Sequence, residues 1–280
     1  MENFFTKKRN ILIISLICTA LWGSAFPVVK IGYKILQIET QDIYSKIYFA
    51  GLRFFIASIM VFLIQKIILK EKIHMEKSYI KPIITLGLLQ TSLQYFFFYI
   101  YADDKLDSNK ILSLVLGFSG VILVNLGKDF NLSFKFIGEG FLLTAALLNT
   151  IATFYVKTIS NNIEPFLISG WQMFSGSIPL LIIGKIGMAG NNLNFNINSI
   201  LLIIYAAFIS AVAFSLWYML LKYNPAGKIS IYRLFIPVFG SIFSALFVKG
   251  ENFTINILIG LLLVILGIFT LNMNNKKSYS

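Results

Sequence analysis

The chain has 280 residues, of which 57% are hydrophobic and 13% are charged, and its mean hydropathy is +0.79. A soluble domain of this size needs more polar residues to cover its surface, so the composition excludes a soluble globular protein and indicates a polytopic membrane protein. The net charge of +12 is spread over short loops and helix ends and is not gathered in one patch with interleaved aromatic residues. This distribution argues against a nucleic-acid partner and favours the lipid bilayer and its anionic headgroups.

Nine stretches are long and apolar enough to cross a membrane as helices of roughly 20 residues. They are expected at about 11–30, 47–69, 79–100, 109–127, 136–157, 164–184, 199–222, 228–248 and 253–273. The alternating pattern of barrel strands is absent, so we expect an all-α helical bundle of nine transmembrane helices. The first stretch follows Lys7-Lys8-Arg9, and we expect it to be kept as the first helix rather than cleaved, with the N-terminus in the cytoplasm.

The second half of the chain repeats the first. Leu21–Lys30 and Leu148–Lys157 are similar apolar stretches that end in lysine, at an offset of 127 residues. Further matches join Tyr99 with Tyr218 at an offset of 119, and Asp104, Ser113 and Gly120 with Glu251, Gly260 and Gly267 at an offset of 147. We therefore expect two related units, residues 1–127 with four spans and residues 128–280 with five. The change in offset, 147 minus 119, corresponds to a fourth helix that the first unit lacks.

Several short motifs follow one another in a recognisable order. They are Trp22-Gly23-Ser24-Ala25-Phe26-Pro27 with Lys30, Arg53-Phe54, Asn224-Pro225-Ala226-Gly227, Pro237-Val238-Phe239, and Lys249-Gly250-Glu251 before Gly260 and Gly267. In this order and spacing they resemble the EamA family of the drug/metabolite transporter (DMT) superfamily. The resemblance implies two inverted five-helix repeats around a central cavity, and transport of small metabolites, amino acids or toxic compounds across the inner membrane.

The missing fourth span departs from that pattern and leaves two hypotheses open. One is a multi-pass transporter of the cell (inner) membrane that exports a small organic metabolite or amino acid. The other is a transport-inactive, truncated family member, or a membrane subunit completed by a homodimer or a second kind of chain. Two complete five-helix copies would cross the membrane in opposite directions. The lysines of the loops show no bias that would settle which way the second half faces.

Arg53 and Arg233 are the charges set most clearly inside apolar spans, where an unpaired guanidinium is costly, so both are candidates for substrate binding. The alternative is that the side chains extend toward the membrane surface, and for Arg53 this is at least as well supported. The other cavity candidates carry polar or aromatic groups on expected spans: Trp22, Ser24, Gln90, Gln94, Tyr95, Asn149, Trp217 and Tyr218. Hydrogen bonds between helices explain the Gln and Asn residues equally well. Hinge candidates are Pro27, Pro179 and Pro237, although kinks without function are as common.

The sequence predicts no enzyme, metal or cofactor. Asp103-Asp104-Lys105-Leu106-Asp107 matches the magnesium-diphosphate motif of prenyl transferases, but no second acidic cluster accompanies it, so we expect the match to be accidental. His74 is the only histidine and Cys18 the only cysteine, which leaves no metal-ligand set. Every carboxylate lies near a predicted helix end or in a loop, so proton coupling has no evident carrier within the membrane.

Overall fold

The computed structural model describes residues 2–71, 73–93, 141–189 and 193–249, and all regular secondary structure in these residues is helical. The order is α1 (Glu2–Phe5), α2 (Lys8–Ile35), α3 (Ile43–Leu63), the π-helical turn η1 (Ile64–Ile68), α4 (Lys77–Gly87), the π-helical turn η2 (Leu88–Leu93), α8 (Phe141–Ile159), α9 (Pro165–Gly187), α10 (Ile197–Tyr223), α11 (Ala226–Ser230), the 3-10 turn η4 (Ile231–Leu234) and α12 (Phe235–Phe247). The all-α prediction is confirmed for these residues.

Four helices are long and apolar enough to cross a membrane: Lys8–Ile35, Ile43–Ile68, Pro165–Gly187 and Ile197–Tyr223. They correspond to four of the predicted spans. The described parts of α4 with η2, of α8 and of α12 match three more spans over shorter lengths. The predicted spans 109–127 and 253–273 lie outside the described residues, so the count of nine stays a prediction.

The predicted span 228–248 is helical over the described residues, but the structure divides it into α11, η4 and α12. Pro237 lies in the first turn of α12 and has no N–H to donate to the carbonyl of Arg233, four residues earlier. Proline also disfavours α-helical backbone angles at the residue before it. The chain therefore passes through a 3-10 turn before α12 begins.

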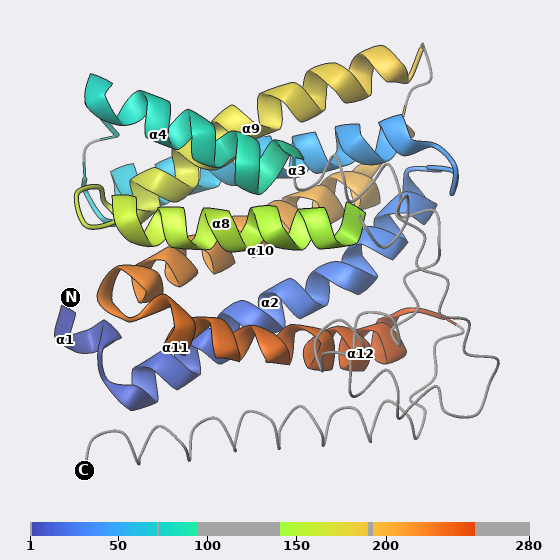
Figure 1. Ribbon diagram of the computed structural model, residues 1–280. Coiled ribbons are helices and arrows are strands. Elements are labelled where there is room, and N and C mark those ends of the chain that lie inside the picture. The colour runs from blue at the N-terminus through green and yellow to red at the C-terminus, as the bar shows by residue number, and fades with distance from the viewer. Residues whose placement is uncertain (1, 72, 94–140, 190–192, 250–280) are drawn as a thin grey trace.

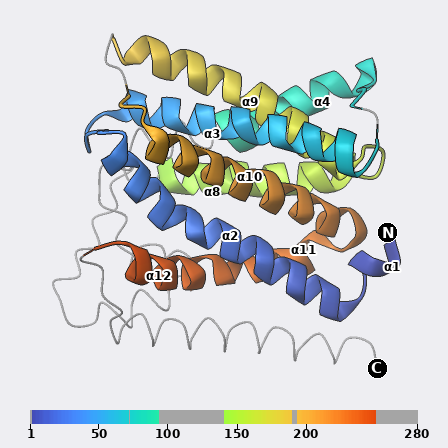
Figure 2. The ribbon, with the colours of Figure 1, turned by 180° about the vertical axis from the view of Figure 1, so that it is seen from behind.

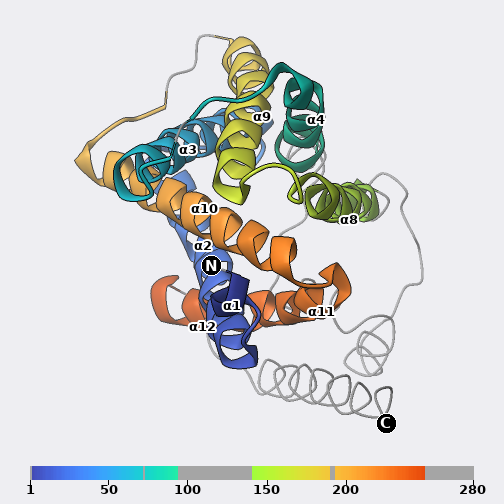
Figure 3. The ribbon, with the colours of Figure 1, turned by 90° about the vertical axis from the view of Figure 1, so that its left-hand side faces the viewer.

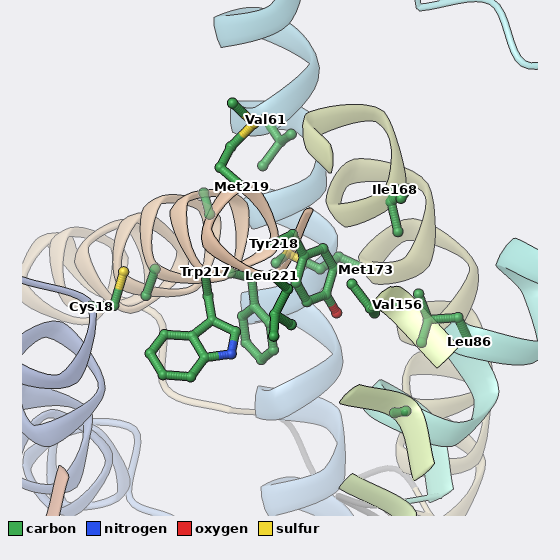
Figure 4. Packing of buried hydrophobic residues seen from close by; sticks show 14 of the residues in the cluster. Cys18, Val61, Leu86, Val156, Ile168, Met173, Trp217, Tyr218, Met219 and Leu221 are labelled. Atoms are coloured by element: carbon green, nitrogen blue, oxygen red, sulfur yellow. The ribbon is translucent and has the colours of Figure 1, made fainter. Parts of the chain in front are cut away.

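The helices pack side by side in a fixed spatial order. α9 packs on α3, α3 on α10, α10 on α2, and α2 on α12, as the front and back views agree (Figures 1 and 2). α4 lies against α9 and also touches α8 (Figure 3). The largest buried side chains come from several helices, with α10 at the centre (Figure 4). One face of α10 therefore meets α2 and another meets α3.

α3 and α9 are antiparallel and touch along their whole length. Tyr44 and Tyr48, near the start of α3, face Gly187 and Gly184, near the end of α9. At the other end of the pair, Phe62 faces Gly170. A Cβ atom on Gly184 would lie 2.6 Å from the backbone nitrogen of Tyr48, so glycine is required for this approach.

α2 and α8 also run in opposite directions. Phe5, just before α2, stacks on Tyr223 at the end of α10, with ring centroids 5.9 Å apart. Lys157, in the last turn of α8, donates from Nζ to the carbonyl of Lys222 at 2.9 Å. The first turn of α2 thus lies at the same end of the bundle as the last turns of α8 and α10 (Figure 1). We call this the α1 end, and the opposite end, where the backbone of Asn194 donates to the carbonyl of Leu36, the far end.

Candidate functional site

Five of the predicted cavity residues meet in the interior of the bundle. Trp22 comes from α2, Asn149 from α8, Trp217 and Tyr218 from α10, and Arg233 from η4. We call these five residues the Arg233 cluster. Four separate segments are needed to assemble it.

Arg233 is held by a hydrogen bond and by two aromatic rings. Its Nη1 donates to Oδ1 of Asn149. Its Cζ atom lies 5.2 Å from the centre of the Trp217 ring and 5.7 Å from that of Trp22, within the range of cation–π attraction. The two indoles meet edge to face, with centroids 5.1 Å apart. The rings therefore fix the position of the guanidinium and offset part of the cost of burying its charge.

The Trp22-Gly23 pair explains why η4 can reach α2. A Cβ atom on Gly23 would lie 2.6 Å from Cβ of Phe239 and 2.8 Å from the backbone nitrogen of Gly240. Glycine at this position therefore lets α12 contact the backbone of α2. Because η4 leads directly into α12, this contact brings Arg233 beside the Trp22 ring.

Three polar atoms of the cluster are buried and have no hydrogen-bond partner in the described structure: Nε of Arg233, Nε1 of Trp217 and the hydroxyl oxygen of Tyr218. Trp217 is fully buried and Tyr218 is 2% exposed. The two residues are consecutive in α10, and the Tyr218 hydroxyl points toward Val156 of α8 (Figure 4). An unsatisfied buried polar group costs about 1–3 kcal/mol, so three in one cluster call for a functional explanation.

Two members of the cluster lie near mid-depth in the bundle. Trp22 is halfway along α2, and Asn149 is halfway along α8. Membrane transporters place their substrate sites near the midplane, between helices of opposite direction. The position of the Arg233 cluster fits that rule.

The other candidates fall outside the cluster. Ser24 donates to the carbonyl of Leu21 at 2.8 Å and lies 3.3 Å from the hydroxyl of Tyr205. Arg53 is 5% exposed, so its side chain is buried rather than extended to the membrane surface, and its Cζ lies 4.4 Å from the Phe54 ring centre. Gln90 is buried in η2. Gln94 and Tyr95 lie outside the described residues.

The hinge candidates have different surroundings. α2 continues through Pro27 and α9 continues through Pro179 without a break in the helix. Only Pro237 lies next to a change of helix type, from η4 to α12. Hinge motion at these three prolines stays a prediction.

Sequence reasoning missed a polar contact between η2 and α9. Thr91 donates to Oε1 of Gln172 at 3.1 Å, and Ser92 donates to the carbonyl of Gly176 at 2.7 Å. The available signal was Gln172, an amide in the middle of an apolar span. The partner was not predictable, because Thr91 lies within the π-helical turn η2, where the side chains are rotated relative to those of a regular α-helix.

Metal ligands do not gather in the described part of the chain, where no three His, Cys, Asp or Glu side chains share a site. His74 is exposed in the loop before α4. The DDxxD stretch 103–107 lies outside the described residues.

Comparison with known proteins gives relatives along almost the full chain. Residues 136–273 match the EamA-like transporter family model. The uncharacterized transporter YoaV of Bacillus subtilis is 26% identical over 291 aligned positions, which cover 92% of this chain and 96% of that protein. YvbV, an uncharacterized transporter of the same organism, is 24% identical over 299 positions, covering 96% and 93%. An uncharacterized transporter of Archaeoglobus fulgidus is 23% identical over 286 positions, covering 92% and 96%.

One crystal structure superposes on 98% of this chain and 100% of its own, with a TM-score of 0.69 at 10% identity, which is a likeness of fold alone. The family model matches a segment that includes α8 to α12 and thus three of the four segments that form the Arg233 cluster. Residues 136–273 of this chain therefore resemble the EamA-like transporter family.

Proposed function

We propose that the protein is a transporter of the cell membrane that exports a small organic metabolite or amino acid, with the Arg233 cluster as its substrate site. The observation that carries this proposal is the contact of Arg233 with Trp22 and Asn149, each halfway along its helix. Beside this contact three buried polar atoms have no hydrogen-bond partner among the described residues. A small solute with hydrogen-bonding groups would satisfy them when it binds.

The directions of the helices support an alternating-access mechanism. The repeat pairs α2 with α8 and α3 with α9, and in each pair the two helices run in opposite directions. Inverted pairs of this kind let one half rock against the other around a site between them. Rocking would expose the Arg233 cluster first to one side of the membrane and then to the other.

The alignments support the proposal that this chain is about one helix shorter than its relatives but corresponds to them from end to end. The three alignments run over 291, 299 and 286 positions but take in 92%, 96% and 92% of the 280 residues here. Each relative therefore has about 30 positions with no counterpart, which is the length of one spanning helix and a turn. Because these relatives are named as transporters and are covered almost completely, a transport-inactive remnant is not favoured.

The basic residues support a cytoplasmic α1 end. Those near this end are Lys7, Lys8, Arg9, Lys66, Lys70, Lys77, Lys81, Lys157, Lys222 and Lys228. Fewer lie near the far end, where the described residues include Lys30, Lys34, Lys46, Lys185 and Lys249. Cytoplasmic loops carry an excess of Lys and Arg, so this distribution supports a cytoplasmic N-terminus.

Counterflow in proteoliposomes tests the proposal. Vesicles loaded with a mixture of unlabelled amino acids and organic acids are diluted into labelled members of the mixture, one at a time. We expect at least one solute to accumulate well above the level in protein-free vesicles, and Trp217→Ala to abolish that accumulation.

Trp171→Ala is the control, because Trp171 is a second indole within the bundle, partly buried against Phe62 and Phe174 and outside the cluster. This variant should retain transport. Failure of every solute to accumulate, or full transport by Trp217→Ala, would contradict the proposed function.

A further inference from the structure

We propose that the solute bound by the Arg233 cluster is an organic monoanion, a carboxylate attached to an apolar or aromatic body. This inference rests on the proposed function and narrows it to one class of substrate. It starts from the charge of Arg233, from its own unsatisfied Nε, and from the unsatisfied polar atoms of Trp217 and Tyr218.

No carboxylate of the described chain faces Arg233. The described acidic residues all lie in loops or near helix ends: Glu2, Glu39, Asp42, Glu71, Glu76 and Glu164. The hydrogen bond that Arg233 makes goes to a neutral amide, and its other contacts are the faces of two indoles. Amide and indoles position the cation without neutralising it, so the cluster favours an anion and disfavours a cation.

The unsatisfied atoms suit a carboxylate in particular. Asn149 occupies Nη1 of the guanidinium, while Nε still has a hydrogen to donate. Nε1 of Trp217 can only donate, and the Tyr218 hydroxyl can donate as well. A carboxylate has two oxygens that accept several hydrogen bonds, and a charged acceptor makes the stronger ones.

The single charge of Arg233 and the aromatic walls of the cluster narrow the class of ligand further. Arg233 supplies one positive charge, so a singly charged anion is balanced and a doubly charged one is not. The walls of the cluster are aromatic: Trp22 meets Phe214 edge to face at 5.4 Å, and Phe214 meets Tyr218 at 6.0 Å. Such walls favour a flat apolar body over a strongly hydrated one.

Binding to the purified protein in detergent tests the class directly, with tryptophan fluorescence as the readout. The probes are phenylacetate, phenylacetamide and phenethylamine, which share one ring and differ in charge. We expect phenylacetate to bind at least tenfold more tightly than the amide and the amine not to bind. Equal affinities for the acid and the amide would overturn the inference.

Asn149→Asp is the decisive variant, because it places a carboxylate beside Arg233 and keeps the guanidinium in the chain. We expect it to raise the Tm of the ligand-free protein and to weaken phenylacetate binding at least tenfold. Arg233→Gln should abolish the preference for the acid over the amide. The control Arg9→Gln changes an exposed arginine of α2 and should leave affinity and preference unaltered.

Unchanged phenylacetate affinity in Asn149→Asp would also overturn the inference, and this result does not depend on whether Arg233→Gln folds. The proposed function fails separately. Counterflow of a neutral or cationic solute that depends on Trp217 would leave the transporter standing and reject the anion class. Binding of phenylacetate without counterflow of any solute would uphold the class of ligand and reject transport.

Discussion

Arg233 shows how a cation can be kept inside a membrane protein without a carboxylate partner in the described chain. Two indole faces and one amide oxygen surround the guanidinium. Cation–π attraction grows when the pair is desolvated, to about 2 kcal/mol or more, and this offsets part of the cost of removing the charge from water. The arrangement leaves hydrogen-bonding capacity free at Nε, which a salt bridge would have occupied.

A double-mutant cycle of Trp22→Leu with Arg233→Leu measures the attraction between these two side chains. We expect a coupling free energy of roughly 0.5–2 kcal/mol in favour of the native pair, from unfolding in mixed micelles. The matched cycle of Trp171→Leu with Arg233→Leu should give a coupling near zero. Additivity in the first cycle would mean that the ring merely fills space beside Arg233.

The sequence predicted the members of the cluster but not their meeting. Trp22, Asn149, Trp217, Tyr218 and Arg233 all stand out as polar or aromatic residues on apolar spans. Arg233 and Asn149 are 84 residues apart, and their contact depends on the 3-10 turn η4, which no periodicity signals. The sequence could not distinguish Arg53 from Arg233, because both are charged residues within apolar spans. In the structure the described ring contact of Arg53 is with its own neighbour Phe54.

At the scale of elements, glycines set which helices approach each other most closely. Gly87 of α4 and Gly176 of α9 face each other, and a Cβ on Gly176 would lie 3.0 Å from the carbonyl carbon of Gly87. Gly51 of α3 meets the backbone of Leu181 in the same way. Small residues at helix contacts let backbones pack closely where the membrane supplies no hydrophobic drive between helices.

Gly176→Ala tests this packing. The added methyl group meets backbone atoms of α4, which cannot move without shifting the helix, so we expect a loss of stability of about 1–3 kcal/mol. Gly32→Ala is the matched control, because its methyl group meets only the side-chain ends of Leu202 and Phe49. That change should cost less, on the order of 1 kcal/mol or below. Equal losses of stability in the two variants would show that backbone contact is not the deciding factor.

Helices with strong signals agreed with their predictions. Asn196 caps α10 and shares a capping box with Ser199, and Asp42 caps α3 by accepting from the backbone of Ser45. The π-helical turns η1 and η2 were not predicted, because one extra residue in a turn leaves hydropathy unchanged. The spacing of apolar residues therefore located the helices but not the irregular turns that orient Thr91 and Ser92.

At the scale of the molecule, the two halves are distinguished by the directions of their helices. α8 runs opposite to α2 and α9 opposite to α3, so the loop between α8 and α9 lies at the α1 end. The loop between α9 and α10 lies at the far end, beside Leu36. The sequence alone allowed the two halves to be either inverted or parallel, because the lysines in the loops of the second half are evenly divided between the two sides.

Cysteine labelling distinguishes the two arrangements. The native Cys18 is fully buried, so it should give little background. An impermeant maleimide should label Gln41→Cys and Asn194→Cys in intact cells. It should label Asn161→Cys and Lys77→Cys only after the cells are opened. Parallel halves would instead place Asn161 on the same side as Gln41.

The short helix α1 contacts the end of α10, far along the chain. Asn224 donates from Nδ2 to the carbonyl of Phe5 at 3.0 Å, and Phe5 stacks on Tyr223. These partners are 219 residues apart in the chain. During synthesis the amino terminus therefore emerges from the ribosome first, but it cannot make these contacts until α10 and Asn224 have been made. The first residues to be made are therefore among the last to reach their final contacts.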